Sequence, residues 1–272
     1  MIDLHLHTTA SDGRSTPAEL VSEAAAAGIR TMAVTDHDTV AALPEAREAA
    51  ERAAIQFVPG IEVSAVREGR DVHVLGYFID EANAGLAQFL EEQRASRWRR
   101  VTVMVERLAA LGIQIDVSRF ASAPSGRAIG RPAIARALVE GGFASDVSDA
   151  FTRFLTRGCA AFVPREAPLP DVVIDQIMAA GGIASVAHPG KLQRDEWLPH
   201  LVRRGLGAIE AFHPDHSPED TSRYLAAADA FGIAVTGGSD YHGPGSGRSA
   251  ALGQVSLADD RYATLRARVE PA

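Results

Sequence analysis

Short runs of apolar residues alternate with longer alanine-rich stretches along most of this chain. Because strands are short and helices need longer runs, this alternation predicts βαβ units and an α/β fold with a parallel sheet or barrel. The expected strands cover residues 2–6, 31–35, 57–63, 72–78, 183–187, 208–211 and 233–236.

The rhythm changes between residues 81 and 163, where the pattern becomes mainly helical. We expect one long helix over 86–111, further helices near 133–140 and 146–155, and a loose linker at 121–130. The chain is thus predicted to form a barrel from residues 1–80 and 164–272, interrupted by an inserted helical cap subdomain at 81–163.

Arginines on the expected long helix are interleaved with glutamates, which indicates a solvated face, with a nucleic-acid path as the alternative. These arginines are Arg94, Arg97, Arg99, Arg100 and Arg107.

Composition sets limits on location and partners. The chain has 272 residues and a formal charge of −8, which argues against a broad surface for duplex nucleic acid but allows a nucleotide substrate. Its single cysteine, Cys159, excludes an internal disulfide and fits a reducing compartment. No leader-like or membrane-length apolar run is visible, so we expect a cytoplasmic protein with no membrane partner. The oligomeric state stays open.

Histidines and carboxylates gather where the expected strands end. His5 and His7 are two residues apart, so a strand directs both imidazoles to one face. His37, His188 and Asp240 follow later strands, and active sites of parallel α/β barrels lie at that edge. A histidine–carboxylate mixture without thiolate favours manganese, iron or zinc at a catalytic site over a structural zinc site.

Six ordered motifs carry a family resemblance: HLHTTASDG, AVTDHD, PGIEVS, HVLGY, AHPG and GSDYHG. Together they resemble the PHP (polymerase and histidinol phosphatase) superfamily of metal-dependent phosphoesterases. The resemblance implies a distorted (β/α)7 barrel and three divalent metal ions, Mn²⁺, Fe²⁺ or Zn²⁺. The helical segment, with Gly130, Arg131 and Pro132, is most similar to the stand-alone branch that acts on nucleoside phosphates and short oligonucleotides.

The resemblance also implies nine metal ligands in three groups. They are His5 and His7 with Glu62 and Asp240, Glu62 again with His73 and His188, and Asp12 with His37 and His242. Among them, Asp12, His37, Glu62, Asp240 and His242 are expected to act in catalysis.

The expected reaction is release of phosphate from a nucleoside mono- or 3′,5′-bisphosphate, or from a short oligonucleotide. Three divalent ions outweigh the charge of three carboxylates and a bridging hydroxide, which suits a phosphate and gives a nucleophile at neutral pH. The alternatives are 5′→3′ exonuclease action, histidinol phosphate phosphatase action and a non-catalytic metal-binding module. Amidohydrolase chemistry lacks a carboxylated-lysine candidate, because the only lysine, Lys191, follows a proline–glycine turn.

Substrate contacts are expected from charged and imidazole side chains near the strand ends, with a plain surface role as the alternative for each. They are Arg127, Arg131, Lys191, His213 and His216. His200, in an expected helix, is interpreted as structural. Asp36 is expected either to orient His37 or to cap its strand. The chain departs from the family at Ala133, where relatives tend to carry histidine.

Overall fold

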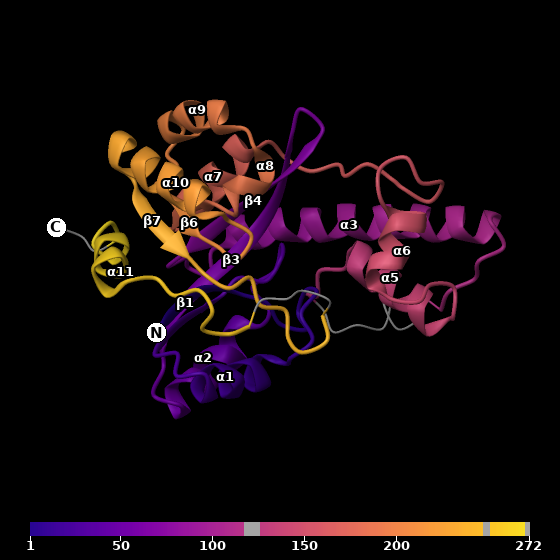
Figure 1. Ribbon diagram of the computed structural model, residues 1–272, viewed down its shortest axis with the longest axis horizontal. Helices are drawn as coiled ribbons and strands as arrows, with labels where there is room; N and C mark the ends of the chain where they lie inside the picture. Colours follow the sequence, from indigo (N-terminus) through magenta and orange to yellow (C-terminus); the bar gives the residue numbers. More distant parts are fainter. Residues whose placement is uncertain (117–125, 247–250, 270–272) are drawn as a thin grey trace.

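Seven strands form one sheet that curls into a nearly closed barrel, in the order in which they occur along the chain (Figure 1). The structure is a computed structural model and describes residues 1–116, 126–246 and 251–269. The strands are β1 (Ile2–Leu6), β2 (Thr31–Val34), β3 (Gln56–Arg67), β4 (Arg70–Tyr77), β5 (Ile183–Val186), β6 (Ala208–Phe212) and β7 (Ala234–Gly237).

The expectation of a parallel sheet is wrong for one strand, because β4 runs antiparallel to both β3 and β5. Its connection to β3 is a two-residue hairpin turn at Glu68 and Gly69, with φ values of 52° and 71°. Such a turn matches the twist of antiparallel strands, whereas a parallel pair needs a crossover of a dozen or more residues. The short interval between the two expected strands left no room for that crossover.

Helices cover the outside of the barrel and form a separate group beside it. They are α1 (Pro17–Ala26), α2 (Leu43–Arg52), α3 (Ala84–Ala110), α5 (Arg131–Glu140), α6 (Val147–Ala150), a π-helical turn (Phe151–Leu155), α7 (Pro170–Ala179), α8 (Pro189–Leu192), a 3₁₀ turn (Asp195–Trp197), α9 (Leu198–Arg203), α10 (Pro218–Phe231) and α11 (Asp259–Arg266). Thr16 caps α1 in a capping box with Glu19.

The barrel closes where the chain beyond β7 meets β1. The backbone N–H of His7 donates to the carbonyl of Tyr241 at 2.9 Å, and Leu6 pairs with Tyr241 in a parallel bridge. Gly238 permits this approach, because a Cβ there would lie 2.4 Å from the backbone nitrogen of His5. Closure brings the first and last strands of the barrel, and the polar residues that they carry, to one place.

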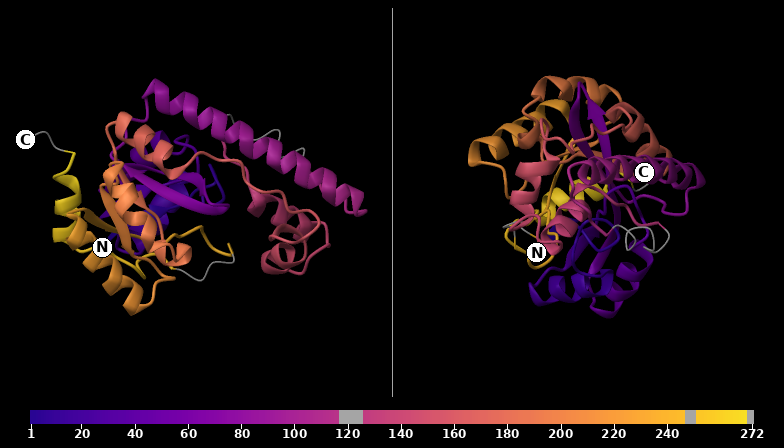
Figure 2. Two further views of the ribbon diagram at one scale, coloured as in Figure 1. Left: turned by 90° about the horizontal axis from the view of Figure 1, so that it is seen from above. Right: turned by 90° about the vertical axis from the view of Figure 1, so that its right-hand side faces the viewer.

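Helix α3 spans two hydrophobic clusters. Its first turns contribute Leu86 and Leu90 to the barrel core, and its last turns contribute Met104 and Leu108 to a second cluster with α5 and the π-helical turn. At a rise of 1.5 Å per residue the helix is about 40 Å long. It runs from the barrel to α5, α6 and the π-helical turn, which together with α3 are called the helical insert below (Figures 1 and 2). Residues 121–125, half of the expected linker at 121–130, lie outside the described residues.

The arginines of α3 do not form the simple solvated face expected of them. Arg97 binds Asp38 and Ser64 of the barrel, and Arg94 donates to the carbonyl of Asp38 at 3.2 Å. Arg100 and Arg107 donate to backbone carbonyls of the segment that returns to the barrel. Arg99 is exposed, as expected. Four of the five arginines therefore contact residues that are distant in sequence.

Candidate metal centre

The nine side chains predicted as metal ligands lie together at one end of the barrel. The parallel strands deliver theirs at or after their carboxyl ends: His5 on β1, His37 after β2 and His188 after β5. His73 lies near the start of β4, opposite Ser64 of β3. Because β4 is antiparallel, its beginning is at the same end of the barrel as the carboxyl ends of the parallel strands, which explains how His73 joins the group.

Glu62 on β3 is the carboxylate that most of the expected histidine ligands contact. This carboxylate is 1% exposed, and five imidazoles from four different segments approach its two oxygens. The distances are 2.8 Å from His73 Nδ1, 3.0 Å from His37 Nδ1, 3.2 Å from His188 Nε2, 3.3 Å from His7 Nε2 and 3.5 Å from His5 Nε2. Because different imidazoles face each of its two oxygens, the Glu62 carboxylate could bridge two cations.

Two further carboxylates flank Glu62. Asp240 Oδ1 lies 3.4 Å from His5 Nε2 and 3.3 Å from His7 Nε2. Asp12 Oδ1 lies 3.1 Å from His242 Nε2 and 3.7 Å from His7 Nδ1, and its Oδ2 is 3.9 Å from His37. Groups of closely spaced ligand atoms are His7 with Asp12, His37 and His242; His5 with His7 and Asp240; His37 with Glu62 and His73; and His5 with Glu210 and His213.

Backbone strain accompanies the centre. Asp38, His188 and Asp240 adopt positive φ values of 51°, 31° and 51°. Non-glycine residues seldom occupy this left-handed region, and they persist there where surrounding structure holds them, often at functional sites. His188 and Asp240 turn at the ends of β5 and β7, which directs their side chains across the barrel mouth.

The protonation state differs between the expected ligands. Burial holds the pKa of His188 at about 4 and also lowers the pKa of His37 and His73, so these imidazoles are neutral. The carboxyl of Glu62 keeps its pKa well below the usual range, because facing imidazoles outweigh the opposing effect of burial. For His7, nearby carboxylates outweigh burial and raise the pKa to about 9, and for His5 they raise it as well, so a metal ion at these two rings must displace their protons. Ionised carboxylates and neutral imidazoles are the forms that bind metal.

The donor atoms themselves fit metal ions. His5 Nε2, His7 Nε2, His37 Nδ1 and His73 Nδ1 are fully buried and have no hydrogen-bond partner among the described residues. Buried polar atoms are nearly always satisfied, so a cluster of unsatisfied nitrogens facing carboxylate oxygens needs another partner. Divalent cations held between these nitrogens and the carboxylates would supply that partner.

Glu210, in the middle of β6, was missed by the sequence interpretation. Its Oε1 lies 2.8 Å from His5 Nδ1, and its Oε2 accepts a hydrogen bond of 2.6 Å from the backbone N–H of His188. It therefore fixes the ring of one expected ligand and the main chain of another. The signal was available, since a glutamate inside the apolar run 208–211 is costly to bury without a partner.

Asp36 acts differently from either expectation. Its Oδ1 accepts from the backbone N–H of Thr8 at 2.8 Å and its Oδ2 from the Thr8 hydroxyl at 2.6 Å, and Ser11 also donates to it. The side chain thus holds the loop that leads to Asp12, and it neither orients His37 nor caps its own strand. Asp3, also buried, accepts from the backbone N–H of Ser239 at 2.9 Å, and burial raises its pKa to about 6.

Four other residues singled out in the sequence have distinct places. His213 Nε2 lies 3.4 Å from Asp240 Oδ2, beside the centre. Lys191 pairs with Asp215 at 2.6 Å and is 3.6 Å from Asp240. His216 uses both ring nitrogens in the fold: Nε2 accepts from the backbone N–H of Gly190, and Nδ1 bonds the carbonyl of Ala211. His200 pairs with Asp171 away from the centre.

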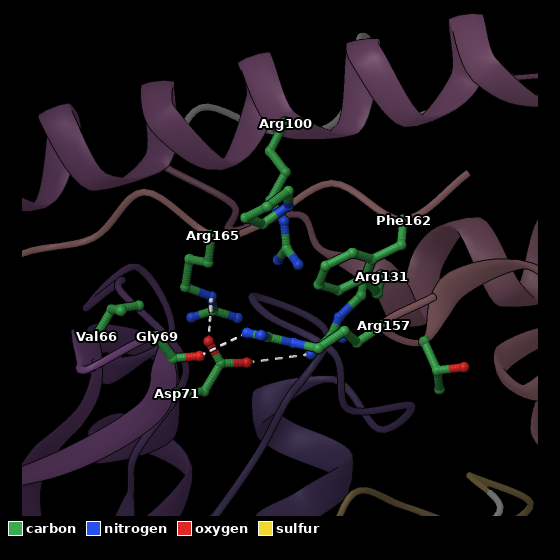
Figure 3. A pocket seen from close by; sticks show the side chains of 10 residues that line it. Val66, Gly69, Asp71, Arg100, Arg131, Arg157, Phe162 and Arg165 are labelled. Atoms are coloured by element: carbon green, nitrogen blue, oxygen red, sulfur yellow. Dashed lines mark hydrogen bonds and ion pairs between the residues drawn. The ribbon is translucent and has the colours of Figure 1, made fainter. Parts of the chain in front are cut away.

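Arg131 belongs to an arginine-lined pocket of about 230 Å³ (Figure 3). Its Nη2 lies 3.2 Å from Asp71 Oδ2, and Arg165 Nε is 3.7 Å from the other oxygen. Arg100 and Arg157 complete the group, and burial together with its charged neighbours lowers the pKa of Arg100 to about 9. Arg127 and Ala133 line a different pocket with Ser11 and Arg136, so a side chain at position 133 faces that space.

Comparison with known proteins defines the class as a metal-dependent phosphoesterase. The chain belongs to the PHP family, whose domain matches residues 3–118. Among the described residues, none of the helices has the length and apolar composition that crossing a membrane requires.

Three relatives match almost the whole chain. The 5′-3′ exoribonuclease Rnm of Escherichia coli is 36% identical over 89% of this chain and 85% of its own length. A phosphoribosyl 1,2-cyclic phosphate 1,2-diphosphodiesterase of Eggerthella lenta is 37% identical over 89% and 94%. A 3′,5′-nucleoside bisphosphate phosphatase of Chromobacterium violaceum is 35% identical over 90% and 88%.

Two solved structures share the fold over 98% of this chain. A Bifidobacterium adolescentis protein, predicted to be a metal-dependent phosphoesterase, has a TM-score of 0.90, 36% identity and 95% coverage of its own chain. A Chromobacterium violaceum protein named an amidohydrolase, which holds sulfate and no metal, has a TM-score of 0.87, 33% identity and 96% coverage.

Proposed function

We propose that this protein releases phosphate from a nucleoside mono- or 3′,5′-bisphosphate or from a short oligonucleotide. The observation that carries the proposal is the buried Glu62 carboxylate, surrounded by five imidazoles and flanked by Asp12 and Asp240. The names of the relatives support a phosphorylated nucleotide as the substrate class.

We propose three divalent ions for the centre, in the grouping that the family resemblance implies. His5 and His7 would share the first with Glu62 and Asp240, and His73 and His188 the second with Glu62. Asp12, His37 and His242 would hold the third. When bound, such ions lower the pKa of water to about 7 and offset phosphoryl charge. Manganese, iron and zinc all suit this donor set.

Basic side chains of the protein lie where they could hold the substrate. Asp71 and His73 lie on one face of β4, about 7 Å apart along the strand, so the arginine pocket adjoins the centre. Arg131 and its neighbours would bind a phosphate through paired N–H groups. His213 and Lys191, beside Asp240, would orient or protonate the leaving oxygen. The helical insert, which supplies Arg131 and Arg100, would cap the barrel mouth.

A second candidate is stepwise 5′→3′ removal of nucleotides from RNA. It is favoured by the 36% identity to a 5′-3′ exoribonuclease over most of both chains. The two activities use the same centre and differ in the bond that breaks. A cytoplasmic location remains a prediction from composition.

A substrate screen with added manganese tests the proposal. It covers mononucleotides, 3′,5′-bisphosphates, histidinol phosphate and short RNA, with phosphate release and chain shortening as separate readouts. His7→Ala and Asp240→Asn should each lower turnover by more than about 100-fold, because changes to residues that merely orient ligands already cost 10–100-fold.

Matched controls are His200→Ala and Asp229→Asn, a histidine and an exposed aspartate away from the centre. They should retain most activity. Full activity in folded His7→Ala and Asp240→Asn proteins would overturn the proposed centre.

A further inference from the structure

A cavity of about 680 Å³ lies between the barrel mouth and the helical insert. Its barrel side includes Asp12 and His242, and its insert side comes from α5, α6 and the π-helical turn. These helices face the segment that follows β7 (Figure 1). The cavity is thus continuous with the candidate metal centre.

The wall next to the centre is polar and cationic. Arg136 lines the cavity, and its Nη1 donates to the backbone carbonyl of Asp12 at 3.3 Å. Arg14 also lines it. A phosphate at Asp12 and His242 would therefore have guanidinium groups beside it on the side that leads into the cavity.

The opposite wall is apolar and contains one aromatic ring. Pro132, Val139, Val147 and Phe151 line it, and all four are only partly buried. The guanidinium of Arg131 lies 5.8 Å from the centre of the Phe151 ring. Phe151 begins the π-helical turn, and such turns are rare and frequently lie at functional sites. Ser145 and Ser148, which also line the cavity, add hydroxyl groups.

We infer that this cavity binds the nucleoside part of the substrate, with the base against the ring of Phe151. The inference rests on the proposed function for its phosphate end. A base needs a flat apolar surface and a few hydrogen-bonding groups, which this wall offers. The ribose would then lie between the wall and Arg136. A phosphorylated sugar without a base leaves the apolar wall uncovered, so the cavity selects for nucleotides.

The test uses adenosine as a probe, because an unphosphorylated nucleoside needs no turnover. Its affinity for the metal-free protein is measured by ligand-observed NMR for wild type, Phe151→Ala, Phe151→Trp and Phe143→Ala. Phe143 is the matched control, since it packs against the same hydrophobic cluster and does not line the cavity. Loss of a stacking partner should weaken adenosine binding about tenfold in Phe151→Ala, while Phe151→Trp and Phe143→Ala bind as wild type does.

A second readout compares substrates. The ratio of kcat/KM for adenosine 5′-monophosphate to that for ribose 5-phosphate should fall about tenfold in Phe151→Ala and stay at the wild-type value in Phe143→Ala. Equal adenosine affinity in Phe151→Ala and Phe143→Ala, or no binding to wild type, would overturn the inference. Absence of phosphate release from every substrate would instead overturn the proposed function, since adenosine binding is measured without turnover.

Discussion

At the scale of single residues, buried carboxylates that are not in the predicted ligand set shape the candidate centre. Glu210 has no exposed surface and contacts both the ring of His5 and the backbone of His188. Its pKa is lowered because His5 outweighs the raising effect of burial, so it is ionised. An ionised carboxylate fixes the tautomer of an imidazole and strengthens its donor nitrogen.

Glu210→Gln should therefore weaken metal binding by about 10–100-fold. The amide keeps the volume but loses the charge that holds the His5 ring. The measurement is the affinity for manganese, followed by electron paramagnetic resonance of the free ion.

Ser185→Ala is the control for Glu210→Gln, because Ser185 is buried on the neighbouring strand and bonds Thr236 at 3.0 Å. It should bind manganese as wild type does. Equal affinity in the two variants would show that Glu210 does not orient a ligand.

At the scale of elements, α3 joins the helical insert to the loop that carries His37. Arg97 from α3 binds Asp38 and donates to Ser64 Oγ at 2.7 Å, while Ser64 N donates to Asp38 Oδ1 at 2.8 Å. The pKa of Asp38 is lowered, because Arg97 and Arg165 outweigh the effect of burial. The side chains of Arg97 and Asp38 are only 10% and 2% exposed, so this ion pair is largely out of water.

Arg97→Gln should lower the free energy of unfolding by about 3 kcal/mol, because it leaves the Asp38 carboxylate buried without its principal cation. Urea unfolding followed by circular dichroism measures the change. Arg99→Gln, two residues further along the same helix and exposed, should stay within about 0.5 kcal/mol of wild type. If the two variants unfold at the same urea concentration, the pair contributes nothing to the attachment of α3.

At the scale of the whole molecule, the centre connects strands from β1 to β7. Its members come from both ends of the barrel sheet, which a parallel bridge between Leu6 and Tyr241 holds together. A cation held by side chains from several of these strands would bind only the folded chain, because the same side chains are far apart in the unfolded chain. Metal binding should therefore stabilise the entire barrel.

Removal of metal with EDTA should lower the melting temperature of the protein by about 5–10 °C relative to protein with manganese at 100 times its Kd. This ligand excess stabilises by about 2.7 kcal/mol, and each kcal/mol shifts Tm by about 2–4 °C in a chain of this size class. Differential scanning calorimetry measures the shift. Glu62→Gln should show a much smaller difference, whereas an unchanged Tm on chelation of wild type would contradict a cation shared across the barrel.

The sequence by itself determined the features that depend on local order. The positions of the seven strands and the long helix 86–111 follow from short-range patterns, although β3 extends four residues beyond its expected end. The described helix α3 (Ala84–Ala110) differs from the expectation by two residues at its start and one at its end. The motifs also identified nine side chains that the structure brings to one end of the barrel. Most of them lie at or just after the end of a strand, so the position of the strand determines the position of the side chain.

Only the tertiary structure decided which groups meet across the chain. His5 and Glu210 are 205 positions apart, and Arg97 reaches Asp38 from 59 positions away. The direction of β4, the cavity behind Asp12 and the arginine pocket likewise arise from closure of the sheet and the return of the insert. The periodicity of apolar residues indicates which face of a helix or strand a side chain occupies. The residue that this side chain contacts is decided by packing between distant segments, which no local sequence pattern describes.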